Sequence, residues 1–144
     1  MRPVMDEAAL AAFYAERFPQ AAGEMELAAI TDEGARMRMR PATRHLRPGG
    51  TLSGPAMFGL ADVCFYLAVL SRIGPEALAV TVSSAIDFMR RPQAEAPLLA
   101  EARLLKLGRR LAVGDVLLTS AGAAGPVARA SMTYALPPRG ENMG

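Results

Sequence analysis

Apolar residues fall on every helical face of residues 55–72, the longest hydrophobic segment of the chain. Ser53 precedes this segment as a candidate N-cap, and Gly74 follows it as a helix stop. Asp62 is the only charged residue in the segment before its last position. Because a helix that is hydrophobic all round must be buried, we predict a central helix over about residues 55–72 that carries one buried carboxylate.

Alternating patterns typical of antiparallel strands occur on both sides of this segment. Residues 24–30 alternate loosely, and residues 35–40 alternate strictly with arginine on one face, so these two runs predict a hairpin. Four further strand-like runs follow the helical segment, at residues 78–89, 98–107, 110–120 and 126–136.

The first of these later runs is predicted to have one apolar face and one hydroxyl face. Strict alternation places Thr81 and Ser83 together on the hydroxyl face. A hydroxyl on a half-buried strand is usually structural, so the pattern alone gives these two residues no function. The apolar face is predicted to carry Val80, Val82, Ile86 and Phe88.

The order of the elements predicts the fold class. Residues 6–19 have the spacing of a short amphipathic helix with Asp6 as its N-cap, and they precede the hairpin. We therefore expect a single α+β domain over residues 1–137, in which an antiparallel sheet of five to six strands curls around the central helix. One sheet layer leaves the outer side of that helix uncovered, so we expect a homodimer or a dimer of dimers. Residues 138–144 are expected to form a flexible tail.

Composition narrows the functional classes. The 144 residues carry a net charge of +2 with scattered arginines, which does not favour nucleic-acid binding. The single cysteine, Cys64, excludes an intrachain disulfide, and the single histidine, His45, argues against a His-rich metal site. The apolar run around Asp62 is shorter than the roughly 20 residues that a bilayer requires, so we expect no membrane span. The first residues lack the apolar core of a signal peptide, so a cytoplasmic location is expected.

Three segments resemble the hotdog-fold thioesterases, in the subgroup of the phenylacetyl-CoA and 4-hydroxybenzoyl-CoA thioesterases. They are residues 49–65 (GGTLSGPAMFGLADVCF), 80–92 (VTVSSAIDFMRRP) and 100–116 (AEARLLKLGRRLAVGDV). The resemblance extends over roughly residues 24–136 and rests on the order and spacing of these segments rather than on any one of them. It implies a hotdog fold and hydrolysis of an acyl-CoA thioester to a free acid and CoA.

The resemblance also implies roles for individual residues. Asp62 matches the catalytic carboxylate, which acts as a general base or as a nucleophile. The backbone N–H of Gly54 matches the group that polarises the thioester carbonyl, and Thr81 matches a hydroxyl that a partner subunit supplies in some members. Here Ser53-Gly54-Pro55 replaces the usual His-Gly-Gly turn, and Pro55 has no N–H to serve as a second donor.

Further residues are assigned to substrate binding on the same basis. Arginines at strand ends suit the phosphates of CoA, although each one taken singly is more often a solvated turn residue. A glycine within a helix, such as Gly59, leaves space for an acyl chain or for a closely packed strand. The implied substrate-binding residues are Ser53, Pro55, Phe58, Gly59, Arg91, Arg109 and Arg110.

Several interpretations remain open from the residues alone. They do not decide whether Asp62 is catalytic or is a helix-surface carboxylate at a dimer seam. We expect His45 to be a surface or capping residue, and Cys64 to be a small buried apolar one. No metal or cofactor is expected, because no zinc spacing, phosphate-binding loop or dinucleotide fingerprint is present. The alternative functions are a non-catalytic acyl-CoA binder and a hotdog hydratase or dehydratase.

Overall fold

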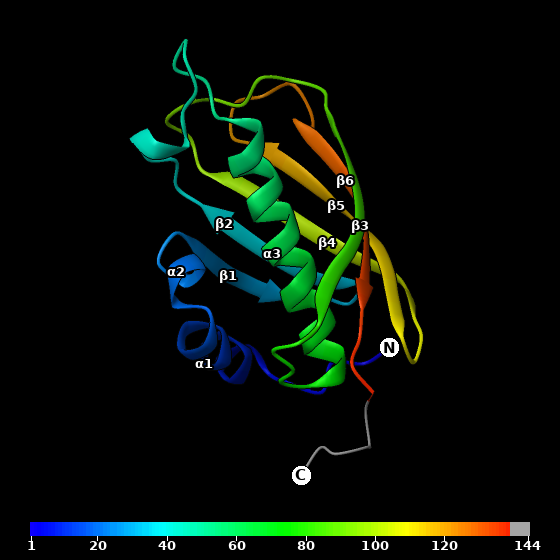
Figure 1. Cartoon of the computed structure of the whole chain (residues 1–144). Coiled ribbons are helices and arrows are strands. Elements are labelled where there is room, and N and C mark those ends of the chain that lie inside the picture. The colour runs from blue at the N-terminus through cyan, green and yellow to red at the C-terminus, as the bar shows by residue number, and fades with distance from the viewer. Residues whose placement is uncertain (139–144) are drawn as a thin grey trace.

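A six-stranded antiparallel sheet curves around one long helix, α3 (Gly54–Ile73), in the computed structural model of the protein (Figure 1). The structure describes residues 1–138, so the predicted tail lies almost entirely outside the described residues. The strand order is β1-β2-β4-β5-β6-β3, which leaves β1 and β3 at the two edges. This arrangement confirms the predicted α+β hotdog class. The other elements are α1 (Glu7–Arg17), α2 (Pro19–Ala22), β1 (Met25–Ile30), β2 (Gly34–Met39), a 3-10 helix (Thr43–His45), β3 (Val80–Phe88), β4 (Leu98–Leu107), β5 (Leu111–Ser120) and β6 (Ala128–Ala135).

Local signals at its two ends define α3. The Ser53 hydroxyl oxygen accepts a hydrogen bond from the Ala56 N–H at 3.2 Å, as expected of an N-cap. Gly74 ends the helix at a φ of 95°, and its N–H donates to the Leu70 carbonyl. The helix has the length and hydropathy of a membrane span, but 67% of its most apolar window is buried inside this domain. It is therefore the core helix of the sheet.

The prediction that α3 is buried on every face is wrong for one stripe. The sheet covers most of the helix, but residues spaced three or four apart on its outer side remain at least partly exposed. We call this surface the open stripe; it consists of Pro55, Phe58, Gly59, Asp62 and Tyr66. The single sheet layer has no second layer to cover it, so the only acidic side chain of α3 lies beside solvent rather than within the core.

The edge strand β3 also differs from the prediction. Its pairing with β6 shifts register between Thr81 and Ser83, which makes Val82 a bulged residue. The bulge turns Thr81 inward and Ser83 outward, so these hydroxyls do not share a face. For the same reason the predicted apolar face of β3 does not form. Of its four predicted residues, only Ile86 is half-buried, whereas Val80, Val82 and Phe88 are exposed.

The N-terminal segment covers the opposite edge of the sheet, beside β1 (Figure 1). Asp6 caps α1 by accepting the Ala9 N–H at 2.8 Å, which confirms the predicted cap. Pro19 begins the short helix α2 instead of simply closing α1. The buried Tyr14 hydroxyl donates to the Met25 carbonyl at 2.9 Å, which ties α1 to β1.

Arg72, in the last turn of α3, joins that helix to the β1–β2 turn. The side chain is almost fully buried, and one guanidinium nitrogen donates to the Gly34 carbonyl at 2.8 Å and to the Ser71 hydroxyl at 2.7 Å. The other terminal nitrogen donates to the carbonyls of Thr31 at 2.7 Å and Asp32 at 2.9 Å. Burial lowers the pKa of this guanidinium below its ordinary value. One cation therefore serves four acceptors, of which the Gly34 carbonyl also accepts the Thr31 N–H at 3.0 Å.

Replacing Arg72 with methionine should destabilise the fold by about 2–4 kcal/mol, because the β1–β2 turn loses three hydrogen bonds from a charged donor that ties it to α3. Chemical denaturation would measure this loss as a lower free energy of unfolding. Arg36→Met is the matched control: Arg36 pairs with Glu101 at 2.9 Å on an exposed surface, and its loss should cost less than about 1 kcal/mol. Equal losses in the two variants would contradict the role given to Arg72.

Candidate active site

Asp62 lies on the open stripe of α3, where two hydroxyl groups hold one of its carboxylate oxygens. Thr81 donates to Asp62 Oδ1 at 2.5 Å, and Tyr134 donates to the same atom at 2.8 Å. Within residues 1–138, Oδ2 makes no hydrogen bond. Asp62 is therefore an oriented carboxylate with one engaged oxygen and one oxygen left for a ligand or water.

The strand register explains why both hydroxyls reach the same atom. Thr81 on β3 and Tyr134 on β6 are direct partners across the antiparallel pair, so their side chains lie on the same face of the sheet. That face is the one that carries α3, and the bulge at Val82 is what turns Thr81 toward it. Thr81 thus contacts Asp62 of its own chain.

A cavity of about 460 Å³ opens beside Asp62, and we call it the Asp62 cavity. Three aromatic residues line part of its wall: the ring centroids of Phe18 and Tyr66 are 6.3 Å apart and edge-to-face, and those of Tyr66 and Tyr134 are also 6.3 Å apart. Arg17, at the end of α1, lines the same cavity and is the only cation that residues 1–138 contribute to its wall. Such a space suits an apolar or aromatic group next to a carboxylate.

Burial keeps the tyrosines of this cavity protonated. Desolvation, followed by the negative charge of Asp62, raises the pKa of Tyr134 above its ordinary value. Desolvation also raises the pKa of Tyr66. Tyr134 therefore remains a hydrogen-bond donor to Asp62 at any pH at which the protein would work.

A second cavity, of about 480 Å³, lies at the N-terminus of α3, and we call it the Gly54 cavity. Arg47, Arg90 and Arg91 surround it, with Phe88 on one side. No hydrogen bond from the Gly54 N–H is found within residues 1–138, as expected for the first turn of a helix. This end of the helix therefore combines a free N–H, the positive end of the helix dipole and three arginines, which suits an anionic ligand.

The two cavities cannot serve one small reacting group within a single chain. Gly54 and Asp62 are eight positions apart on the same helix, which separates them by about 12 Å along its axis. A thioester carbonyl needs its oxyanion donor and its attacking group each within about 3 Å. The residues predicted to act together therefore belong to different places on one chain.

The other predicted binding residues are distributed unevenly. Ser53 caps α3, and Pro55 and Phe58 lie on the open stripe without lining either cavity. A Cβ on Gly59 would meet only the Met25 methyl group, at 3.5 Å, so packing within the chain does not require glycine there.

The predicted arginines do not form one cluster. Arg91 lines the Gly54 cavity, whereas Arg109 and Arg110 lie in the β4–β5 turn. The strand register places that turn near Val80, at the end of the sheet opposite Phe88. Neither turn arginine lines the Asp62 cavity or the Gly54 cavity.

His45 was expected to be a surface or capping residue. It caps the 3-10 helix, and it is buried rather than on the surface. Its Nδ1 accepts the Ala42 N–H at 2.8 Å, so the ring proton is on Nε2, which lies 3.4 Å from a Glu24 oxygen. A hydrogen bond from Arg44 to Glu24, together with His45, holds the pKa of that carboxyl below its ordinary value. This group fixes the loop before α3 to β1 and lines neither cavity described above.

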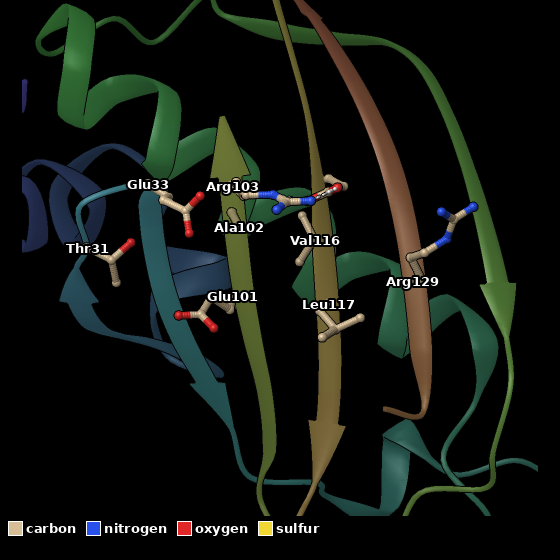
Figure 2. Close-up of a pocket in the computed structure, with 9 residues that line it drawn as sticks. Thr31, Glu33, Glu101, Ala102, Arg103, Val116, Leu117 and Arg129 are labelled. Atoms are coloured by element: carbon tan, nitrogen blue, oxygen red, sulfur yellow. Dashed lines mark hydrogen bonds and ion pairs between the residues drawn. The ribbon is translucent and has the colours of Figure 1, made fainter. Parts of the chain in front are cut away.

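A third cavity, of about 340 Å³, lies on the outer face of the sheet (Figure 2). Glu33, Glu101 and Arg103 point into it, and Arg103 pairs with Asp115 at 2.9 Å. Its walls come from β4 and β5, whose other face covers α3, so the sheet separates it from Asp62. No cluster of His, Cys, Asp and Glu that could hold a metal ion is found among residues 1–138. We assign no chemistry to this cavity.

Several residues of the Asp62 cavity escaped the sequence analysis, among them Arg17, Phe18 and Tyr134. Arg17 and Phe18 end a helix that is remote in sequence from Asp62, and no local pattern connects them. Tyr134 is one of the alternating apolar residues of the last strand, where a tyrosine is an ordinary core residue. Only the pairing of β3 with β6 brings its hydroxyl to the carboxylate.

Comparison with known proteins gives a consistent result. Residues 49–134 match the thioesterase superfamily. A provisionally named thioesterase from Silicibacter sp. TM1040 is 54% identical, with a TM-score of 0.88 and 96% of each chain covered. A variant of the phenylacetic acid degradation protein PaaI from Thermus thermophilus is 30% identical, with a TM-score of 0.71, covering 82% of this chain and 97% of that one.

A more distant structure shares the fold. It is a hypothetical thioesterase from Streptococcus pneumoniae, solved with coenzyme A, which is 22% identical with a TM-score of 0.76 and covers 90% of this chain and 98% of that one. No functionally curated protein gives a significant sequence match.

Cys64 is expected to be chemically silent in the folded protein. It is fully buried, its thiol donates toward the Ala35 and Ala100 carbonyls, and burial raises its pKa to about 12. Thiol titration with a disulfide reagent at about pH 8, near the ordinary pKa of a free thiol, should detect no reaction in the native state. In denaturant, where the pKa returns to its ordinary value, it should detect one thiol per chain. Rapid labelling of the native protein would contradict the burial of this side chain.

Proposed function

Since the chain belongs to the thioesterase superfamily, we propose that it hydrolyses an acyl-CoA thioester to a free acid and CoA. The observation that carries the proposal is the state of Asp62, which is held at one oxygen by Thr81 and Tyr134 and has its other oxygen unengaged beside a cavity. Perturbed or oriented carboxylates in clefts are the usual bases and nucleophiles of such sites.

Oδ2 of Asp62 has two ways to open the thioester. As a general base it takes a proton from water while the water oxygen attacks the carbonyl carbon; the carbon–sulfur bond then breaks, and the CoA thiolate receives the proton. As a nucleophile it forms a mixed anhydride, the CoA thiolate leaves, and water hydrolyses the anhydride in a second step. In both cases the Gly54 N–H would stabilise the negative charge that develops on the carbonyl oxygen.

We further propose that the working site forms between two copies of the chain. The separation of about 12 Å that helix geometry places between Gly54 and Asp62 is removed if two α3 helices meet antiparallel, so that Gly54 of one copy approaches Asp62 of the other. The two-fold axis would then pass near residue 58, midway between them. The open stripe and the exposed edge of β3 provide the apolar surface for such a contact, and Gly59 allows the helices to approach closely.

The arginines of the Gly54 cavity are the proposed site for the phosphates of CoA. Arg47, Arg90 and Arg91 surround the helix N-terminus, and guanidinium groups bind phosphate oxygens in pairs. Arg109 and Arg110, at the far end of the sheet in the same chain, have no comparable cavity.

Replacing Asp62 with asparagine should lower kcat/KM by at least about a hundredfold, because the amide neither accepts a proton nor attacks the carbonyl. A panel of short, long and aromatic acyl-CoAs would be followed by release of the CoA thiol. Asp87→Asn is the matched control, since Asp87 is exposed and pairs only with Arg129 at 3.2 Å; it should keep wild-type turnover. Undiminished turnover in a folded Asp62→Asn protein would remove the proposed mechanism.

Two variants of Gly54 test the site between subunits. Gly54→Pro removes the N–H at a helix position where proline is tolerated, whereas Gly54→Ala keeps the N–H and adds a similar Cβ next to Phe88. Gly54→Pro should therefore lose much more activity than Gly54→Ala.

Mixing inactive Gly54→Pro and Asp62→Asn chains should then restore activity. Each mixed dimer regains one complete site, so random mixing should return about a quarter of the wild-type rate. No recovery, with mixed dimers demonstrated by mass, would show that the two groups act within one chain.

A non-catalytic acyl-CoA binder is the second candidate, and Pro55 is the observation that favours it. Pro55 leaves the first turn of α3 with fewer N–H donors for an oxyanion than a glycine at that position would supply. CoA-dependent thermal stabilisation without turnover of any thioester would establish this function. A hydratase is not favoured, because the chain's one histidine is occupied with Ala42 and Glu24 and lines neither cavity.

A further inference from the structure

We infer that Tyr134 is the positioning residue of this site: its hydroxyl holds Asp62 by Oδ1 and so presents Oδ2 to the reacting group. The inference rests on the proposed function, because it concerns the same carboxylate. It adds a residue on β6 that neither the sequence motifs nor the family match singles out, and it assigns different roles to the two oxygens of Asp62.

The hydroxyl proton of Tyr134 has two acceptors within reach, and geometry and charge favour the carboxylate. The hydroxyl oxygen lies 2.8 Å from Asp62 Oδ1 and 3.0 Å from the Asp62 backbone carbonyl oxygen. That carbonyl already serves the helical ladder of α3. A hydrogen bond to an ionised oxygen is shorter and about twice as strong as one to a neutral oxygen, so the proton belongs mainly to Oδ1.

Tyr134 is also the more rigid of the two donors. Tyr134 is 3% exposed. Its ring packs against two other rings, with centroid distances of 5.3 Å to Phe65 and 6.3 Å to Tyr66. It belongs to β6, which is paired on both sides, whereas Thr81 belongs to the edge strand β3 next to a bulge. A fixed phenol can therefore define where Oδ1 lies, while the threonine follows the position of the edge strand.

Two donors on one oxygen have a chemical consequence. They occupy the lone pairs of Oδ1, so Oδ2 is the oxygen that remains available as a base or nucleophile. Because the pKa of Tyr134 is raised by its burial, the phenol does not lose its proton in the working range and does not become a competing base. The pair thus behaves as one oriented carboxylate with a single reactive oxygen.

Tyr134→Phe removes only the hydroxyl and keeps the packed ring. We expect kcat to fall about ten- to a hundredfold with KM within about twofold, because the contact orients the carboxylate rather than binding substrate. A merely structural role would instead lower the free energy of unfolding and leave kcat per folded chain unchanged.

Tyr14→Phe is the matched control, because it removes a buried hydroxyl that bonds the Met25 carbonyl and does not line the Asp62 cavity. It should lose stability and keep the wild-type kcat. An unchanged kcat in Tyr134→Phe, or the same loss of kcat in Tyr14→Phe, would overturn the inference.

A measurement that needs no turnover separates this inference from the proposed function. Carbon-detected NMR of side-chain carboxyl groups, with the Asp62 signal assigned by its absence in Asp62→Asn, reports the hydrogen bonding of that group directly. At one fixed neutral pH, the Asp62 carboxyl signal should move in Tyr134→Phe, which lacks the donor to Oδ1, and not in Tyr14→Phe. A wild-type protein that hydrolyses no thioester would remove the proposed function, whereas an unmoved signal would remove the role of Tyr134.

Discussion

The structure depends on a carboxylate placed on an otherwise apolar helix. A charge in that position is expensive unless donors or water compensate it, because desolvation of an ion costs several times more than desolvation of a neutral polar group. The chain meets this requirement by leaving one stripe of α3 uncovered and by bringing two hydroxyls from neighbouring strands to one oxygen of Asp62. The antiparallel pairing of β3 with β6, which joins segments far apart in the sequence, is what makes this compensation possible.

The straightness of α3 imposes the second constraint. A helix that rises about 1.5 Å per residue cannot bring its own N-terminus to a side chain roughly two turns further along. The proposed oxyanion donor at Gly54 and the proposed base at Asp62 would therefore have to come from two copies of the helix. The open stripe is at least partly exposed, the edge of β3 is unpaired in this chain, and Gly59 has space for a Cβ.

Much of this arrangement was predictable from the sequence, and the exceptions have physical causes. The central helix, its Ser53 cap, the stop at Gly74 and the six strands follow from local periodicity and turn residues, which act over a few positions. The inward face of β3 could not be predicted in the same way, because a bulge at Val82 reverses the alternation of inward and outward residues and no local sequence pattern indicates it. Tyr134 and Arg17 escaped for another reason: their relation to Asp62 exists only through strand pairing and helix packing.

The edge strand β3 carries residues with two different roles on its two faces. Its outward residues, Val80, Val82 and Phe88, are exposed and suited to pairing with another copy, while its inward Thr81 holds the carboxylate. Any adjustment of β3 on association would therefore be transmitted to Thr81. Tyr134 holds the same oxygen from an interior strand that association does not need to move. A site assembled between subunits can thus keep its carboxylate in place while the surface beside it forms the contact.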